Sequence, residues 1–277
     1  MPVSPSPAFP FVIFFELVLL FAGCLLLWRH GLSRAGRTRT QASAAAMPAW
    51  DITLPGFMLF LWLIICGGLL GQSGVALLCK TSAMDETRGL LFNGGAFHGG
   101  MLLGVLLFNL LFARNSTRAG STLSLGRKMK SGVSTLLIAL PVLTVVGLAW
   151  QFLLSSCGVT LEEQDLIAIF ANTESPLLLT LMILLAVVVA PVTEELIFRA
   201  GIFRYVRTRI PRWAALLVPA LLFAALHANL ASFVPLAALG MIFALAYERT
   251  GSIAVPIIAH GLFNFNTIIL ILSGVGL

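Results

Sequence analysis

Long apolar runs alternate with short polar segments along the whole chain. A membrane crossing needs about 20 residues at about 1.5 Å of rise each, and eight runs approach or exceed that length. They cover residues 11–28, 55–78, 90–112 and 133–154, and four more begin near Pro176, Trp213, Phe233 and Ile253. The runs that begin near Trp213 and Phe233 look short. The pattern predicts an all-α fold, a polytopic membrane bundle of about eight transmembrane helices.

Composition agrees with a membrane protein. Of the 277 residues, 59% are hydrophobic and only 10% are charged, and the mean hydropathy is +1.01. A soluble chain would carry about a quarter charged residues, so a soluble domain is excluded. The net charge of +6 comes from basic residues between apolar runs, without a basic domain. Nucleic acid is therefore not an expected partner.

Loop charges predict the orientation in the membrane, because Lys and Arg of short loops stay on the cytoplasmic side. Alternate loops carry Arg29, Arg34, Arg37 and Arg39, then Arg114, Arg118, Arg127, Lys128 and Lys130, then Arg204, Arg207, Arg209 and Arg212, then Arg249. The other loops carry only Lys80 and Arg88, together with the acids Glu162, Glu163, Asp165 and Glu174. We expect a multi-pass protein of the plasma (inner) membrane with both termini non-cytoplasmic. We also expect two parts: helices of residues 1–175 and a functional core of residues 176–277.

Small residues and cysteines add two local expectations. Gly95, Gly99, Gly100 and Gly104 form overlapping GxxxG spacings, which usually mark close helix packing. Cys79 and Cys157 both fall at helix ends on the non-cytoplasmic side, so a disulfide is conceivable, but it is not expected without supporting distances. The four cysteines show no spacing typical of a metal site.

Polar residues within the apolar runs are unevenly distributed. A charged side chain at bilayer depth costs about 2.5 to 3.5 kcal/mol, so each needs a reason. The first half holds Glu16 and His98, which we assign to packing or pore-facing roles. The second half holds a larger set: Glu194, Glu195, Arg199, His227, His260 and Asn264.

Helical spacing organises this larger set. Glu195 and Arg199 are four residues apart and predict an ion pair that leaves Glu194 free. Phe223 and His227 share one helix face, as do His260 and Asn264. If the helix from Pro176 continues unbroken to Arg209, then Glu194, His227 and Asn264 all lie about 21 to 22 Å from their cytoplasmic helix ends. The polar groups are therefore expected to meet in one layer, beside a kink at Pro191.

The motifs EExxxR, FxxxH and HxxxN on three successive helices resemble the CPBP family, which includes glutamate-type CAAX prenyl endopeptidases and bacteriocin-processing or immunity-associated proteins. The similarity covers residues 189–267, with Ala200 where the family commonly has glycine. It implies an intramembrane endopeptidase without a metal or other cofactor. It further implies that Glu194, assisted by His227, activates a water, and that His260 and Asn264 stabilise the oxyanion. Glu195 paired with Arg199 would orient Glu194, and Phe223 would pack under His227.

Other interpretations stay open at this point. One Glu with two His resembles a catalytic zinc set, although the sequence lacks HExxH. The polar groups also fit a non-enzymatic scaffold, immunity protein or transporter, in which the glutamates form an interfacial ion pair and His260 and Asn264 only hold helices together. The expected partners are the lipid bilayer and a membrane-anchored or lipid-modified protein or peptide substrate.

Overall fold

The computed structural model describes residues 9–34, 47–79, 86–112, 123–159, 169–170, 173 and 175–274. Every regular element within these ranges is a helix, and some helices include a wider π-helical turn, labelled η. The elements are α1 Phe9–Leu27, η1 Trp28–Leu32, α3 Leu54–Cys79, α4 Glu86–Phe112, α5 Leu125–Ser156, α7 Pro176–Leu184, η3 Leu185–Val189, α8 Ala190–Ile197, η4 Phe198–Phe203, α9 Arg204–Val206, α10 Arg212–Ala225, α11 Leu230–Thr250 and α12 Ala254–Leu272.

The predicted helical membrane bundle is confirmed. Within the described residues, seven helical runs are long and apolar enough to cross a membrane, and α10 is a shorter apolar helix. The prediction that the run near Phe233 is short is wrong, since α11 has 21 residues. It begins earlier, at Leu230, because the Asn229 side chain accepts a 2.9 Å hydrogen bond from the Ser232 backbone N–H and caps the helix.

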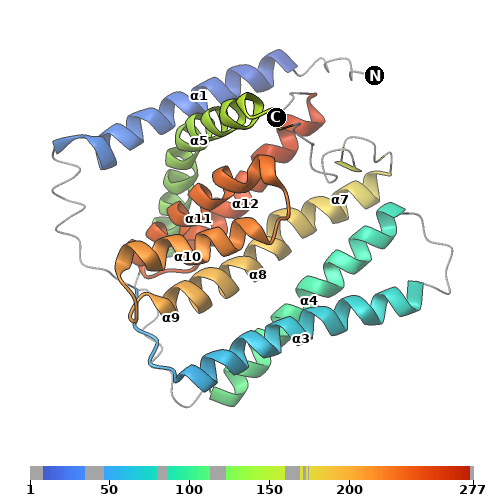
Figure 1. The fold of residues 1–277 in the computed structure, drawn as a ribbon. Helices are drawn as coiled ribbons and strands as arrows, with labels where there is room; N and C mark the ends of the chain where they lie inside the picture. Colours follow the sequence, from blue (N-terminus) through green and yellow to red (C-terminus); the bar gives the residue numbers. More distant parts are fainter. Residues whose placement is uncertain are drawn as a thin grey trace.

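Consecutive helices run in alternating directions (Figure 1). The C-terminal end of α1, the short helix α9 and the N-terminal end of α10 lie at one end of the bundle. The start of α1 and the end of α12 lie at the other end. Which end faces the cytoplasm stays a prediction. Several charged residues used for it lie outside the described residues, namely Arg37, Arg39, Lys80, Arg114, Arg118, Glu162, Glu163, Asp165 and Glu174.

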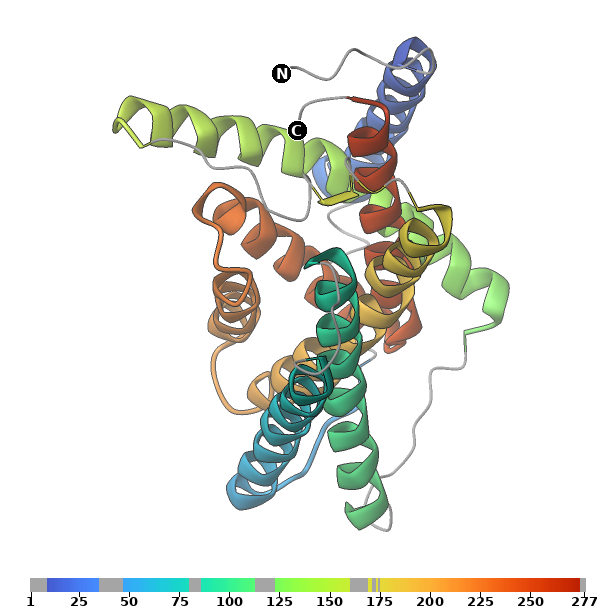
Figure 2. The ribbon, with the colours of Figure 1, turned by 90° about the vertical axis from the view of Figure 1, so that its right-hand side faces the viewer.

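Helix α5 crosses the bundle obliquely and packs against α12, as Figure 2 shows. It also contacts α1 and α11. The contact with α1 is close at Gly23, where an added Cβ would clash with the carbonyl of Leu137 and the ring of Pro141. Helix α1 is otherwise largely exposed, as expected of a helix surrounded by lipid.

Glycines bring α3 and α4 into direct contact. A Cβ at Gly100 would clash with the carbonyl of Gly67, and one at Gly104 with the carbonyl of Leu63. The predicted close packing is confirmed for this pair. It is wrong for Gly95 and Gly99, whose Cβ positions have no atom of the described residues within 4 Å. The two spacings point to different sides of α4, and only the side of Gly100 and Gly104 meets α3.

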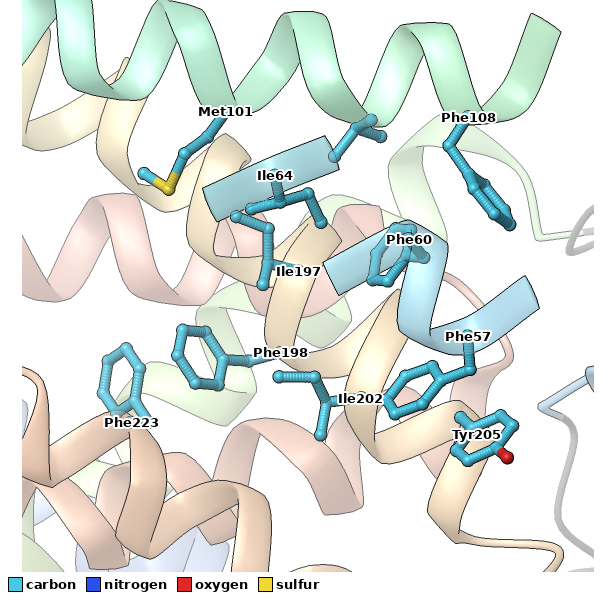
Figure 3. Close-up of a cluster of buried hydrophobic side chains, with 11 residues drawn as sticks. Phe57, Phe60, Ile64, Met101, Phe108, Ile197, Phe198, Ile202, Tyr205 and Phe223 are labelled. Atoms are coloured by element: carbon cyan, nitrogen blue, oxygen red, sulfur yellow. The ribbon is translucent and has the colours of Figure 1, made fainter. Parts of the chain in front are cut away.

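A buried cluster joins the N-terminal and C-terminal helices (Figure 3). Its members come from α3, α4, α8, η4, α9 and α10, and they are Phe57, Phe60, Ile64, Met101, Val105, Phe108, Ile197, Phe198, Ile202, Tyr205 and Phe223. The rings of Phe57 and Tyr205 stack at 3.8 Å between centroids. The cluster fixes α3 and α4 beside the glutamate helix. The predicted division at residue 175 stays a prediction.

Two arginines hold the segment before α3 against α9. Arg204 donates to the carbonyls of Pro48 and Ala49 at 2.9 and 2.8 Å, and Arg209 donates to the carbonyl of Ile52 at 2.6 Å. Arg204 also lies over the ring of Trp50. Carbonyl oxygens therefore satisfy the guanidinium of Arg204.

The conceivable disulfide finds no support in the structure. Cys157 is a free thiol at the end of α5. The side chain of Cys79 lies outside the described residues.

Candidate active site

The helix that carries the two glutamates contains two π-helical turns. It runs without a break from Pro176 to Val206, with η3 before Pro191 and η4 after the glutamates. Proline has no N–H to donate to the carbonyl four residues earlier, and its ring needs room there, which the wider turn of η3 provides. The predicted unbroken course is right through Arg199. The prediction that the helix extends to Arg209 is wrong, since α9 ends at Val206.

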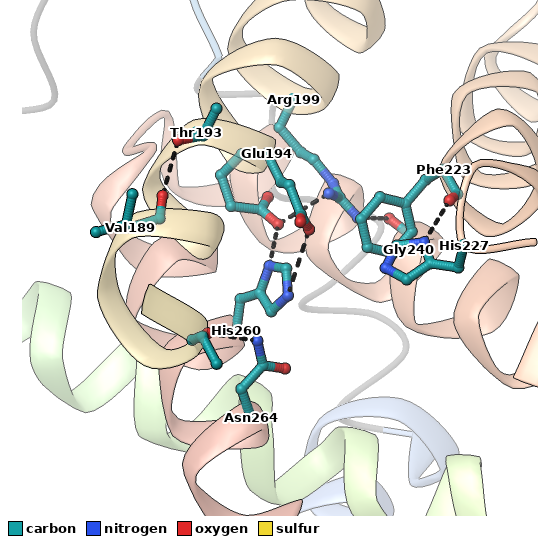
Figure 4. A network of polar contacts seen from close by, with 11 residues as sticks. Val189, Thr193, Glu194, Arg199, Phe223, His227, Gly240, His260 and Asn264 are labelled. Atoms are coloured by element: carbon teal, nitrogen blue, oxygen red, sulfur yellow. Dashed lines mark hydrogen bonds and ion pairs between the residues drawn. The ribbon is translucent and has the colours of Figure 1, made fainter. Parts of the chain in front are cut away.

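Glu195, Arg199 and His260 form a buried polar core (Figure 4). Arg199 donates from Nη1 to Oε1 of Glu195 at 2.8 Å, which confirms the predicted pair. Its Nη2 donates to the carbonyl of Gly240 at 3.4 Å. His260 places Nδ1 2.9 Å from the same Oε1 of Glu195. Since an ionised carboxylate can only accept, His260 Nδ1 is the donor.

Aromatic rings surround the buried guanidinium of Arg199. Its Cζ lies 4.6 Å from the ring centroid of Phe223 and 5.4 Å from that of Phe243, and a third ring, Phe198, is 6.0 Å away. Such contacts stabilise a desolvated cation. The ion pair and the rings together explain how a fully buried arginine is accommodated in an apolar bundle.

Glu194 differs from its neighbour in both exposure and partners. Its side chain is 19% exposed, whereas that of Glu195 is fully buried. Oε2 of Glu194 lies 3.7 Å from Nε2 of His260. The two nitrogens of His260 therefore face the two carboxylates, as Figure 4 shows. Glu195 is held in an ion pair, and Glu194 is the carboxylate left accessible, as its sequence position predicts.

His227 lies at the exposed C-terminal end of α10. Its Nδ1 is 2.8 Å from the carbonyl of Phe223, so Nδ1 carries the proton and Nε2 points elsewhere. Its ring packs on the ring of Phe223 at 4.7 Å between centroids, as predicted for this pair. The next residue, Ala228, has a φ of 49°, which is uncommon for a residue with a Cβ.

Asn264 binds the π-helical turn that precedes the glutamates. Its Nδ2 donates to the carbonyl of Ala186 at 2.8 Å. One turn earlier on α12, a Cβ at Gly261 would lie 2.6 Å from the carbonyl of Val187. Glycine thus permits the close approach of α12 to η3 that brings Asn264 to this carbonyl. One N–H of the Asn264 amide is used in this bond and the second is left for another acceptor.

The predicted layer of polar groups is confirmed for Glu194, Glu195, Arg199 and His260. His227 and Asn264 bond to the carbonyls of Phe223 and Ala186, and within the described residues no hydrogen bond or ion pair joins either of them to Glu194. No group of three or more His, Cys, Asp or Glu side chains in the described part of the chain is arranged as metal ligands. The catalytic role of each residue stays a prediction.

One residue near the site was not placed there by sequence. Helix α4, which carries His98, contacts α8, which carries Glu194, and Nδ1 of His98 is buried without a hydrogen-bond partner among the described residues. The only signal for it in the sequence was a single histidine within an apolar run, because no spacing rule relates residues of α4 to residues of α8.

The comparisons with known proteins agree with this geometry. Residues 176–266 match the family model "Type II CAAX prenyl endopeptidase Rce1-like". Over these residues the chain is similar to the Rce1-like members of the CPBP family, and we call residues 176–266 the Rce1-like domain. The resemblance stated from the motifs is thereby confirmed. This Rce1-like domain contains every predicted site residue, from Glu194 to Asn264, and begins at the first residue of α7.

A curated relative extends the similarity beyond the Rce1-like domain. The Bacillus subtilis (strain 168) protein named "Putative membrane peptidase YdiL" is 29% identical over 174 residues, which are 63% of this chain and 69% of that protein. No solved structure matches the chain. The family model and the relative together support membrane protease activity.

Proposed function

We propose that the protein is an intramembrane endopeptidase that hydrolyses a peptide bond in a membrane-anchored or lipid-modified protein or peptide. Glu194 is the general base, and Glu195, Arg199, His227, His260 and Asn264 complete the site. The observation that carries the proposal is the position of His260 between a buried ion-paired carboxylate and a second, accessible one.

The protonation of His260 favours water activation. With the proton on Nδ1 in the bond to Glu195, the neutral ring presents a lone pair at Nε2. The carboxylate of Glu194 opposite it also accepts. A water between these two acceptors donates both of its hydrogens, which leaves an oxygen lone pair for attack.

The bound water and Glu194 account for every bond and proton in the hydrolysis. The water oxygen bonds to the scissile carbonyl carbon, and Glu194 takes the proton. The oxyanion accepts the second N–H of the Asn264 amide. Glu194 returns its proton to the amide nitrogen, and the C–N bond breaks. In this mechanism Glu194 and His260 activate the water together. The family resemblance alone implied that His227 assists Glu194.

The surroundings of His227 support a substrate that comes from the bilayer. His227 is exposed, and the side chains of Leu222, Leu226 and Leu230 on either side of it are exposed as well. Apolar side chains with this exposure face lipid in a membrane bundle. A substrate that reaches His227 past them must itself be lipid-soluble or anchored.

The test compares cleavage products in the membrane proteome of cells that carry wild type, Glu194→Gln, His227→Ala or His260→Ala. The matched control is Glu16→Gln, since Glu16 is an intramembrane carboxylate in α1, a helix that contacts α5 and lies apart from the site. We expect the same fragments to vanish in the three site variants and to persist in the control, at equal protein levels.

Unchanged fragments in well-accumulated site variants would refute the proteolytic mechanism and favour a scaffold or transporter. A chelator added to isolated membranes separates the zinc alternative: fragment formation that stops with the chelator and returns with Zn²⁺ contradicts activation by Glu194 and His260 alone.

A further inference from the structure

Trp150 of α5 bonds to the backbone just after His227, and the proposed reaction does not use this tryptophan. Its indole Nε1 donates to the carbonyl of Leu230 at 2.8 Å, between positions 80 residues apart in the chain. Leu230 is the first residue of α11, directly after residues 226–229, which we call the His227 turn. Helix α5 lies outside the Rce1-like domain. The bond therefore joins an N-terminal helix to the end of the His227 turn.

The His227 turn is exposed for most of its length. Residues 225–228 are exposed, and so is Leu230. Helix α10, which ends at Ala225, packs on α11 and η4 rather than on α5. A segment with few buried contacts opens locally at a small cost in free energy. Hydrogen bonds from neighbouring elements therefore matter for keeping this turn in one conformation.

Packing of α5 on α11 brings Trp150 to the Leu230 carbonyl. The two helices are in contact, and one turn before Trp150 a Cβ at Gly147 would lie 3.9 Å from Cγ of Pro235. Pro235 lies inside α11 and has no N–H to donate to the carbonyl of Ala231. The first turn of α11 thus lacks one of its helical hydrogen bonds, and the indole N–H supports this weakened turn from outside.

The backbone transmits the position of Leu230 to His227. Only Ala228 and Asn229 separate the two residues. The N–H of Ala228 donates to the carbonyl of Ala225 at 3.1 Å, and the side chain of Asn229 caps α11. Because both intervening residues are held in this way, a displacement of Leu230 also displaces His227.

We propose that Trp150 is a positioning residue that holds His227 in the site through its bond to the Leu230 carbonyl. This inference rests on the proposed function, because it assigns a support to a residue of the proposed active site. With the start of α11 tied to α5, the ring of His227 stays on that of Phe223, which in turn packs on the guanidinium of Arg199. An N-terminal helix thereby supports a site whose proposed members all lie in the Rce1-like domain.

The test separates the indole N–H from the bulk of the ring. Trp150→Phe keeps an aromatic ring and removes the donor. Trp150→His loses apolar bulk but can keep a ring N–H at the same place, since Nε2 of histidine and Nε1 of tryptophan are the same number of bonds from Cβ. Trp213→Phe is the matched control, because Trp213 is an exposed tryptophan at the opposite end of α10.

Each variant is measured for the rate at which Glu194-dependent fragments appear in isolated membranes and for the melting temperature of the purified protein in detergent. We expect Trp150→Phe to slow fragment formation about threefold or more, in line with the loss of one hydrogen bond. Trp150→His retains at least about half of the wild-type rate, although it melts no higher than Trp150→Phe, and Trp213→Phe keeps the wild-type rate. A packing role alone ranks the Phe variant above the His variant in both measurements.

Hydrogen exchange gives a second, local measurement. The backbone amides of residues 226–232 exchange faster in Trp150→Phe than in wild type, because the turn opens more often without the bond. Those of residues 213–218, at the other end of α10, exchange at the wild-type rate.

Three results overturn the inference: a smaller loss of rate in Trp150→Phe, a His variant no faster than the Phe variant, or unchanged exchange of residues 226–232. Glu194→Gln distinguishes this failure from that of the proposed function. Fragments that persist in Glu194→Gln refute the endopeptidase mechanism, whereas fragments lost in Glu194→Gln and formed at the wild-type rate in Trp150→Phe refute only the role of Trp150.

Discussion

Nε2 of His260 lies 3.7 Å from Oε2 of Glu194, a separation suited to one bridging water rather than to a direct hydrogen bond. The orientation of the imidazole is fixed from behind by the bond between its Nδ1 and Glu195. Packing adds to this, because the ring of Phe243 lies 5.3 Å from that of His260. The accessible carboxylate therefore faces a ring that is already in place, which is the preorganisation that hydrolysis requires.

The two adjacent glutamates are expected to respond differently to removal. Glu195→Ala leaves Arg199 as a buried charge without its carboxylate, which costs about 3 to 5 kcal/mol. Glu194→Ala removes a partly exposed group with one 3.7 Å contact and changes stability by about 1 kcal/mol or less. Thermal unfolding in detergent measures both. Equal losses of stability in the two variants would contradict the separate assignments of the carboxylates.

Packing of α3 on α4 gives a prediction with an internal control. Gly100→Ala places a methyl group against the carbonyl of Gly67, forces the helices apart and destabilises by about 1 to 3 kcal/mol. Gly99→Ala meets no atom of the described residues within 4 Å and stabilises by about 0.5 to 1 kcal/mol through the lost flexibility of glycine. The melting temperatures of the two variants should move in opposite directions. A lower value for both would argue against the assigned contact face.

The backbone after His227 gives a third prediction. Ala228 has a φ of 49°, a conformation that costs an L-residue about 1 to 2 kcal/mol. Ala228→Gly removes this strain and is expected to be as stable as wild type or more so. Ala228→Val is expected to be less stable than both, since a β-branched side chain tolerates this region poorly. A Val variant that melts at or above the Gly variant would contradict this conformation.

The segment before α3 is expected to depend on Arg209. Its guanidinium donates to the carbonyls of Ile52 and Tyr205 at 2.6 and 2.8 Å and lies over the Tyr205 ring at 3.8 Å. Arg209→Ala should raise the rate of limited proteolysis within residues 47–53 about 10-fold, which mass spectrometry of the fragments measures.

Arg127→Ala is the control for this experiment, because Arg127 is an exposed arginine at the start of α5. Equal protease sensitivity of Arg127→Ala and Arg209→Ala would show that loss of charge, rather than release of the segment, causes the effect.

At the same end of the bundle, a hydrogen bond from Arg212 to the carboxylate of Glu248 raises the pKa of the Arg212 guanidinium further above its ordinary value. Arg207 binds the same carboxylate. Arg212 is therefore charged at every pH at which the protein is handled, and Arg207 lies beside it on the same carboxylate. Their charges contribute to the basic end that the loop pattern assigns to the cytoplasm, and that assignment stays a prediction.

Sequence alone predicted most of the helices, because twenty apolar residues leave a membrane segment few alternatives to a helix. It missed the length of α11, where the side chain of Asn229 caps a helix that starts before the apolar run looks continuous. The glycine pattern of α4 was informative only in part. Spacing identifies a face on which helices can approach, and a partner helix must be present for the approach to occur.

Within the site, the sequence determined the pair of Glu195 and Arg199, because residues four apart on a helix must lie on one face. It also determined the chemistry that three motifs can provide together. Only the tertiary structure decided that His260, rather than His227, lies against Glu194, and that α4 packs against the helix that carries the glutamates. Contacts between helices depend on how the side chains of neighbouring helices pack together. The hydrophobic periodicity of one helix does not determine how its neighbour is rotated about its own axis.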